Sequence, residues 1–247
     1  MNYQTTLEQM KSMRLNAMAE SHYNHLQGRI NAEYTTDQYV SMLIEREWEA
    51  KQNNKINRLI KNARFRFSAS IQDVDYTANR QLDRNVFERL AVLDFIRNKE
   101  NIIITGATGT GKSYLAQALG NQACQFLFKT LYYNTSRLME DLKIARLEGT
   151  YTKVLLKIER VDLLILDDFG LVPLDTQQRQ SLLDIIEGRY DRASTIISSQ
   201  IPVSQWHELI GEGTIADAIL DRIVHSSHRI ELIGDSMRKK QLKKETK

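Results

Sequence analysis

The chain has 247 residues but only one cysteine, Cys124, so it has no internal disulfide. No apolar stretch is long enough to span a bilayer, and residues 1–6 lack the basic and then apolar pattern of a signal peptide. The formal net charge is only +3, so neither sign dominates. These absences argue against a disulfide scaffold and a membrane protein, and we expect a cytoplasmic globular chain with no membrane partner.

The basic residues are unevenly distributed even though the net charge is small. Residues 51–66 contain six Lys or Arg and no acid, and residues 235–247 contain six basic residues against two acidic ones. Such patches suit a polyanion, and nucleic acid is the obvious one. A solvated helix face and a frayed terminus explain the same pattern equally well. Charge alone therefore leaves nucleic-acid binding open.

The chain changes character at two points. Residues 1–67 lack strand signals and predict a helical N-terminal domain for oligomerisation or for DNA or partner contact, with an early helix at about 6–27. An apolar stripe at helical spacing indicates a packing face, and it comprises Val40, Leu43, Ile44, Trp48, Ile56, Leu59, Ile60, Ala63 and Phe67. Residues 68–82 are polar and are expected to form a linker, so the main domain is predicted at 83–247.

From residue 83 onward helices and strands alternate, beginning with a helix through Arg97 that Asp83 is expected to cap. Continuous apolar runs separated by helices are typical of a parallel sheet covered on both faces. We therefore predict an α/β fold with a five-stranded parallel sheet, whose strands lie at about 101–105, 130–134, 161–166, 194–200 and 228–232.

The most informative motif joins the first expected strand to a helix. Residues 106–113 fit the phosphate-binding pattern G-x-x-x-x-G-K-[ST] at every fixed position. Its glycines let backbone N–H groups turn toward an anion, and the helix N-terminus adds partial positive charge. Lys112 is expected to reach the β- and γ-phosphates of a nucleotide, and Ser113 to offer its hydroxyl to Mg²⁺. A chance glycine turn would lack this context. The predicted nucleotide contacts are Gly106, Ala107, Thr108, Gly109, Thr110, Gly111, Lys112, Ser113 and Tyr114.

Two acids, Asp167 and Asp168, end the apolar strand that follows. In phosphate-loop proteins such an acid helps to hold Mg²⁺, which suits Asp167. The next carboxylate can orient an attacking water, which suits Asp168. Acids that merely cap a turn are the alternative, and their position after a phosphate loop favours the functional role. Residues 168–170 also spell the kinase triplet D-F-G, but the chain has no H-R-D catalytic loop.

Three later side chains are further catalytic candidates, with Lys112 and Asp168. Gln200 follows the fourth expected strand, where a polar group can contact the γ-phosphate. Arg222 and Arg238 offer the planar, fixed positive charge that suits phosphate oxygens in a transition state. An ordinary strand end and two surface arginines remain the alternatives. The histidines lack cysteine or carboxylate neighbours at metal-site spacing, so we expect no zinc site.

In this order the motifs resemble the IstB-like transposition helper ATPases, which are similar to the helicase loader DnaC within the AAA+ class. The resemblance covers about residues 5–240 and rests on segments 106–113, 166–170, 198–207, 216–222 and 234–239. It implies an AAA+ fold that binds ATP and Mg²⁺. It also implies that Gln200 is the sensor-1 residue. Arg222 then matches the arginine finger, which acts on a neighbouring subunit's ATP, and Arg238 matches the sensor-2 arginine of its own subunit.

The resemblance further implies partners: a homo-oligomer with ATP at its subunit interfaces, duplex DNA, and an IstA-like transposase. The implied function is ATP-dependent assembly on duplex DNA that assists the transposase in target selection and insertion. A helix at about 135–150 would line the DNA, with phosphate contacts from Arg137, Lys143 and Arg146. Many AAA+ proteins have Asp-Glu where this chain has Asp167-Asp168, and this departure leaves the hydrolysis rate open.

Three other functions stay in view. A DnaC-like helicase loader would bind a replicative helicase and prefer single-stranded DNA. A small-molecule kinase built on a phosphate loop would act as a monomer without DNA. A nucleotide-gated scaffold would bind ATP but scarcely hydrolyse it.

Overall fold

The computed structural model describes residues 3–28, 34–211 and 213–237. It divides into two units, residues 1–58 and 59–247, which we treat separately. Within the described ranges no helix has the length and apolar character needed to cross a membrane.

The first unit is helical. Its elements are α1 (Tyr3–Ser12), α2 (Asn16–Leu26) and most of α3 (Thr36–Ala63). The single helix expected at 6–27 is two helices, because the chain turns at Arg14, which has a left-handed φ of 60°. Leu43 is buried as the apolar stripe predicted, whereas Val40 and Trp48 of the same stripe are exposed. The apolar spacing therefore identified the helix but not which of its residues are covered.

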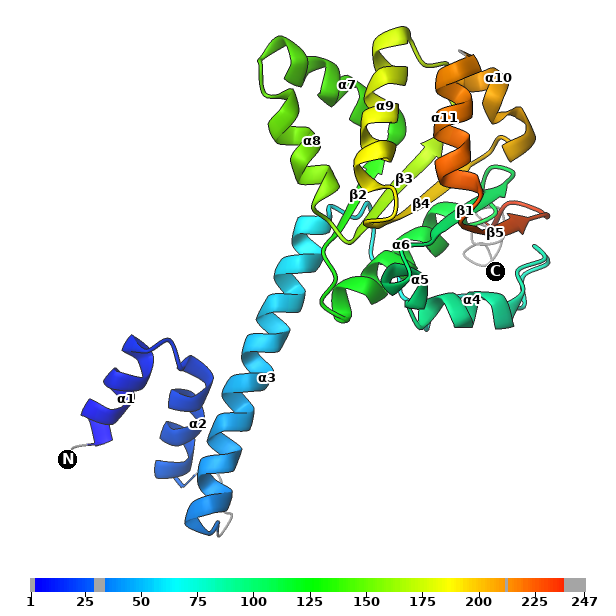
Figure 1. Cartoon of the computed structure of the whole chain (residues 1–247). Helices are drawn as coiled ribbons and strands as arrows, with labels where there is room; N and C mark the ends of the chain where they lie inside the picture. The colour runs from blue at the N-terminus through cyan, green and yellow to red at the C-terminus, as the bar shows by residue number, and fades with distance from the viewer. Residues whose placement is uncertain (1–2, 29–33, 212, 238–247) are drawn as a thin grey trace, which may run out of the picture. The chain divides into compact units, whose positions relative to one another are not determined.

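The second unit is built on a parallel sheet in the order β2-β3-β4-β1-β5 (Figure 1). This confirms the five-stranded parallel prediction. Because β1 lies between β4 and β5, the carboxyl ends of the three central strands meet where the phosphate loop leaves β1. The strands are β1 (Asn101–Gly106), β2 (Thr130–Asn134), β3 (Leu163–Phe169), β4 (Ser194–Ser199) and β5 (Ser227–Leu232).

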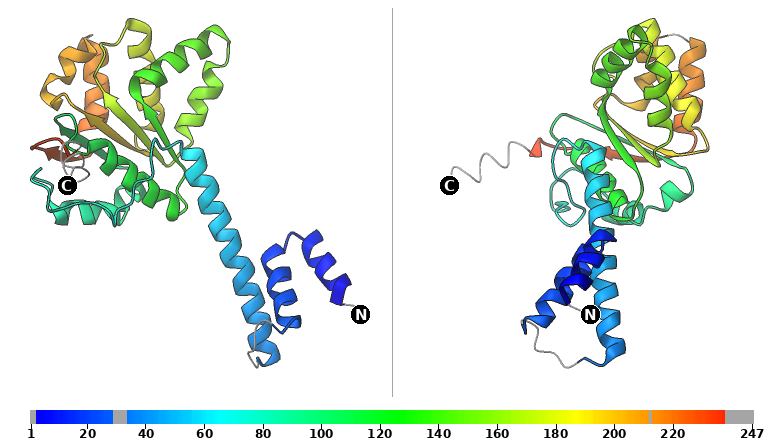
Figure 2. Two further views of the ribbon diagram at one scale, coloured as in Figure 1. Left: turned by 180° about the vertical axis from the view of Figure 1, so that it is seen from behind. Right: turned by 90° about the vertical axis from the view of Figure 1, so that its left-hand side faces the viewer.

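Helices cover both faces of this sheet (Figures 1 and 2). Alternate residues of β1 serve opposite faces, since Ile103 joins one core cluster while Ile102 and Ile104 join the other. The Ile102 side carries α4 (Arg84–Ala91), α5 (Asp94–Arg97) and α6 (Lys112–Gln125). The Ile103 side carries α7 (Thr135–Leu147), α8 (Tyr151–Glu159), α9 (Thr176–Arg189), the short η1 (Val203–Gln205), α10 (Trp206–Ile210) and α11 (Gly213–Val224).

A capping side chain begins α4. The Asp83 carboxylate accepts hydrogen bonds from the backbone N–H groups of Asn85 (2.8 Å) and Val86 (3.1 Å), as expected for a cap of α4. The helix predicted to run to Arg97 is interrupted after α4, because Leu93 adopts a left-handed φ of 71°. The chain then resumes as α5, which leads into β1.

Candidate nucleotide-binding site

The phosphate loop connects β1 to α6, as the motif predicted. Gly109 and Gly111 have φ values of 84° and 97°, which side chains with a Cβ rarely adopt. A Cβ on Gly109 would collide with Ser236, and one on Gly111 would collide with the guanidinium group of Arg80. The two glycines are therefore required by backbone shape and by close neighbours at once.

Lys112 begins α6 and is almost completely buried. Its ammonium group donates a hydrogen bond of 2.9 Å to the carbonyl oxygen of Ala107, across the loop. The lysine that is expected to meet phosphate is thereby held over the loop's own backbone. The next residue, Ser113, donates its hydroxyl to Asp167 on β3 (2.9 Å).

Asp167 has no exposed surface and is held by hydroxyl groups. Its Oδ1 accepts hydrogen bonds from Ser113 and Ser198, and its Oδ2 accepts one from Tyr132 at 2.7 Å. Its backbone carbonyl accepts a further bond from Thr135 (2.9 Å). A carboxylate beside a serine hydroxyl is the set of hard oxygen ligands that Mg²⁺ prefers, so these residues fit that ion.

Asp168 stands differently from its neighbour. Its φ of 56° is left-handed, and the side-chain amide of Asn134 donates a 3.1 Å hydrogen bond to its Oδ2. Partial burial raises the pKa of Asp168, and the charge of Asp167 adds to this, while Lys112, Arg66 and the Asn134 hydrogen bond oppose it. The two carboxylates predicted as a pair thus lie in distinct environments, one bound by hydroxyls and one partly open.

Gln200 follows β4 and is brought to the phosphate loop. Its side-chain oxygen accepts a 2.5 Å hydrogen bond from the hydroxyl of Thr108. Gln200 comes directly after Ser199, the last residue of β4, and therefore lies at the carboxyl end of the sheet beside the phosphate loop. The structure therefore brings together Lys112, Asp167, Asp168 and Gln200 around one loop.

The polar segment expected to be a linker, residues 68–82, is packed within the second unit. Ala69 and Val74 are buried, and Arg80 is only 3% exposed. One guanidinium nitrogen of Arg80 donates to the carbonyl of Thr110 (3.0 Å) and the other to the carbonyl of Asp75 (2.9 Å). Burial lowers the pKa of Arg80. Sequence reasoning missed Arg80 because one cation in a polar run gives no signal of burial.

Residues after β5 return to the same loop. The backbone N–H of Ile233 donates to the carbonyl of Arg80 (3.1 Å), and that of Met237 donates to the carbonyl of Gly109 (2.8 Å). Arg238, the sensor-2 candidate, lies outside the described residues. Met237, the residue before Arg238, nevertheless contacts the phosphate loop.

Tyr114 was predicted as a nucleotide contact, but its side chain is turned elsewhere. Its ring stacks on Phe67 with centroids 6.0 Å apart, and its hydroxyl lies 3.4 Å from the backbone N–H and carbonyl groups of Ser70. Only its backbone remains beside the loop, in the first turn of α6.

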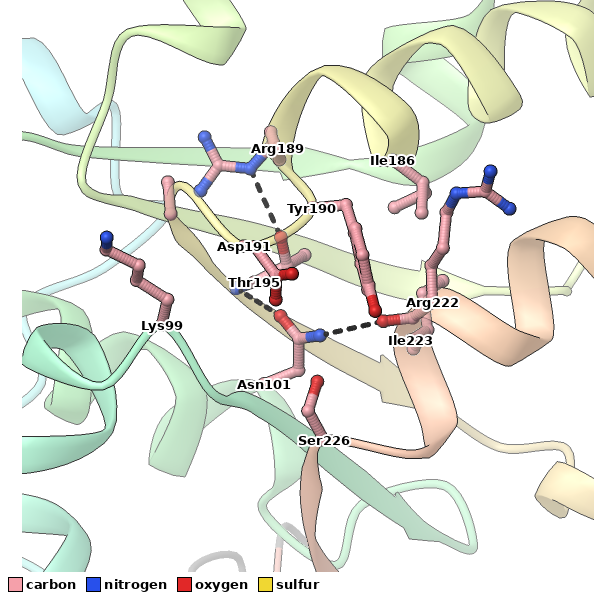
Figure 3. A pocket seen from close by; sticks show the side chains of 11 residues that line it. Lys99, Asn101, Ile186, Arg189, Tyr190, Asp191, Thr195, Arg222, Ile223 and Ser226 are labelled. Atoms are coloured by element: carbon pink, nitrogen blue, oxygen red, sulfur yellow. Dashed lines mark hydrogen bonds between the residues drawn. The ribbon is translucent and has the colours of Figure 1, made fainter.

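Arg222 is not brought to this site. It lies on α11, where its guanidinium group pairs with Glu187 (3.0 Å) and donates to the Ala218 carbonyl (2.8 Å). Its own carbonyl accepts a bond from the amide of Asn101, the first residue of β1 (Figure 3). Gly106 ends that strand, about 17 Å further along. Arg222 therefore stands at the amino end of the sheet, opposite its own phosphate loop.

The three predicted DNA contacts on α7 differ in exposure. Arg137 and Lys143 are exposed. Arg146 is instead held within the chain, because its guanidinium group donates to Ser181 (3.1 Å) and stacks over the Tyr151 ring at 3.6 Å. The sequence did not reveal an exposed basic face on the next helix, α8, which contains Lys153 and Lys157 and continues to Arg160, the residue after the helix.

The strand order, the phosphate loop and the acids at the end of β3 define an α/β P-loop ATPase of the AAA+ class. Solved structures share this fold. The crystal structure of DnaI matches with a TM-score of 0.57 and 23% identity, over 71% of this chain and 93% of that one. AMPPCP-bound DnaA from Aquifex aeolicus matches with a TM-score of 0.55 and 21% identity, over 74% of this chain and 56% of that one.

Within this class the chain belongs to the family described as IstB-like ATP binding protein, whose model matches residues 8–245. An insertion sequence ATP-binding protein of Sinorhizobium fredii, y4pL, is 43% identical over 97% of this chain and 98% of its own length. The insertion sequence IS1162 ATP-binding protein of Pseudomonas fluorescens is 37% identical over 81% and 87%, respectively. These findings confirm the resemblance inferred from the motifs, and the chain is an ATP-binding ATPase.

Proposed function

We propose that this ATPase assembles with ATP on duplex DNA and there assists an IstA-like transposase in target selection and insertion. The observation that carries the proposal is the separation of Arg222 from its own phosphate loop in a chain of the IstB-like family. An ATP site that needs an arginine from a neighbouring copy makes assembly part of the catalytic cycle. This is the property that distinguishes the proposal from a monomeric kinase.

At each site we assign roles to the residues gathered on the loop. The loop amides and Lys112 bind the phosphates, and Asp168 orients the attacking water. Gln200 contacts the γ-phosphate, a role supported by its hydrogen bond to Thr108 (2.5 Å). Ser113 and Asp167 hold Mg²⁺, which when bound neutralises charge on the β- and γ-phosphates. Arg238 acts within the same subunit. This role is supported by the preceding residue, Met237, whose backbone N–H donates to the Gly109 carbonyl of the phosphate loop.

Arg222 serves as the finger that crosses to the next copy. Its exposed partner Glu187 and the solvent around it allow the guanidinium group to exchange one anionic partner for another. ATP bound between copies favours the oligomer, and loss of the γ-phosphate weakens it. Assembly or DNA accordingly stimulates hydrolysis.

We also propose that α7 and α8, the helices between β2 and β3, contact the phosphate backbone of the DNA. Arg137 and Lys143 on α7 are exposed. So are Lys153 and Lys157 on one face of α8 and Arg160, which follows this helix. Contacts of this kind give affinity with little sequence preference and a steep dependence on salt. Since DNA and ATP meet in the cytoplasm, we also propose that location.

The test is the mass of the chain in solution, measured by light scattering after gel filtration with duplex DNA, a non-hydrolysable ATP analogue, or both. We expect an oligomer that contains DNA only when both are present. A single copy at saturating nucleotide and DNA would contradict the proposal. Repeating the measurement with single-stranded DNA and a replicative helicase separates the loader: preference for single strands, together with helicase in the complex, would favour that function instead.

A further inference from the structure

Tyr132 is a buried side chain that the assigned roles leave unused. It lies on β2, an edge strand of the sheet, and is 7% exposed. Its neighbours are apolar residues of the core that α6 covers. A tyrosine hydroxyl in such a place needs a partner, and this one donates to Oδ2 of Asp167 at 2.7 Å.

Ser198 acts on the other oxygen of the same carboxylate. It is fully buried in β4, on the opposite side of β3 from Tyr132, and its hydroxyl donates to Oδ1 of Asp167. The two hydroxyls therefore approach from the strands on either side of the acid. Together they fix the plane of the carboxylate, because each restrains a different oxygen.

Ser113 also donates to Oδ1 of Asp167, but it belongs to the Mg²⁺ site assigned above. When Ser113 serves that ion, Tyr132 and Ser198 are the hydroxyls that remain to orient Asp167. Groups that orient a ligand through a hydrogen bond contribute to metal affinity without touching the metal.

We propose that Tyr132 and Ser198 are positioning residues of the ATPase, which hold the Asp167 carboxylate in the orientation that receives Mg²⁺ beside Ser113. This inference rests on the Mg²⁺ site of the proposed function. It predicts that loss of either hydroxyl weakens the response of nucleotide binding to Mg²⁺ and leaves metal-free nucleotide binding intact.

The experiment measures the affinity for a fluorescent ADP as Mg²⁺ is titrated at constant ionic strength, so no turnover is involved. For Tyr132→Phe we expect the Mg²⁺ concentration at half-effect to rise about 10-fold. In EDTA, its ADP affinity should match the unmodified chain within about twofold. Ser198→Ala should shift the Mg²⁺ response in the same direction.

The matched control is Tyr133→Phe, one residue along the same strand. Tyr133 is half-buried and packs against the other core cluster, so its hydroxyl is on the opposite face of β2 from Asp167. Its Mg²⁺ response should be unchanged. Thermal melts in EDTA report whether each variant is folded, and Ser198→Ala carries the test if Tyr132→Phe does not fold.

Three results would overturn the inference. The first is a folded Tyr132→Phe chain, or the Ser198→Ala chain in its place, whose Mg²⁺ titration overlays that of the unmodified chain. The second is an equal loss of ADP affinity with and without Mg²⁺, since that would indicate a general structural role. The third is an ADP affinity of the unmodified chain that does not depend on Mg²⁺. That result would contradict the proposed Mg²⁺ site itself, and with it the positioning roles of Tyr132 and Ser198.

Discussion

The two ends of the parallel sheet both contain buried polar side chains, but they use them in different ways. At the amino end, Arg189 on α9 is 2% exposed and donates to the backbone carbonyls of Ile158, Val161 and Ser194. At the carboxyl end, the buried Asp167 carboxylate instead accepts hydrogen bonds from hydroxyls of three other elements, although Arg80 and Lys112 there also donate to backbone carbonyls. Figure 3 shows the first of these ends, around Asn101 and Arg189.

This difference separates polar groups that belong to the fold from polar groups that serve a ligand. Backbone carbonyls that accept from Arg189 are fixed by the helix and strand ends that carry them, so the arginine ties those ends together. Burial lowers the pKa of Arg189, and the charges of Asp162 and Glu159 oppose this shift. Side-chain hydroxyls and carboxylates can instead turn to take a new partner. Substitutions at the two ends test this division, and Arg222 is expected to show the largest effect.

Arg222 lies at the amino end but is assigned to chemistry at the carboxyl end of another copy. We expect Arg222→Ala to keep ATP affinity and to lose hydrolysis by about 10³-fold, the lower range for an arginine finger. Steady-state phosphate release and equilibrium ATP binding measure the two quantities. Mixing this variant with Asp168→Ala should restore activity, because mixed interfaces combine an intact arginine with an intact acid. Mixtures without activity would contradict action between copies.

Lys112→Ala tests the carboxyl end directly. Removing a buried cation from a phosphate site should weaken ATP binding by about 30-fold or more, and assembly on DNA should fail with it. The fold should persist, since the lysine donates to the loop's own Ala107 carbonyl. The control is Lys99→Ala, which removes the same charge from an exposed position at the amino end. Assembly of the Lys112 variant with unchanged affinity would break the link between nucleotide and oligomer.

Arg189→Met should show the reverse pattern at the amino end. It leaves buried carbonyls without their donor, so we expect a loss of about 2 kcal/mol in unfolding free energy, with ATP affinity unchanged in the folded protein. Urea unfolding measures the loss. Arg192→Met is the control, because that arginine is exposed nearby and its removal should cost little. A weaker ATP affinity without loss of stability would contradict the assignment of Arg189 to the fold and not to ATP binding.

The smallest effect concerns the pH dependence of hydrolysis. Asp168 must be ionised to orient water, so activity falls as the pH falls through its pKa, which is already raised. Asn134→Asp keeps an acceptor for the α7 cap but replaces the amide donor with a like charge. The pKa of Asp168 should rise, and the acid limb of kcat should move up by about one pH unit. An acid limb of kcat that does not move would contradict the assignment of Asp168 to orienting the attacking water.

Sequence patterns recovered the parts of the molecule that depend on local chemistry. The phosphate loop was readable because its glycines, Lys112 and Ser113 stand at fixed spacing, and the strands were readable as apolar runs. The contacts that the sequence did not reveal are those between residues far apart in the chain. The polar composition of 68–82 gave no sign that Arg80 would be buried against Thr110. Nothing near Arg146 in the chain indicated Ser181 as its partner.

Tyr132 illustrates the same limit within the site. On the sequence it is one aromatic residue of a strand, typical of a half-buried sheet. Its contact with Asp167 joins positions 35 residues apart and becomes visible only when β2 pairs with β3. Gln200 could not be placed from the sequence for a related reason, since its bond with Thr108 joins positions 92 residues apart.

The hydrogen bond from Met237 to Gly109 has a consequence for changes made after β5. It ties the backbone that follows this strand to the loop that binds the phosphates. Inserting a glycine between Leu232 and Met237 would therefore break this bond or displace Gly109. Comparing ATP affinity with and without the insertion would report how much the loop depends on that contact.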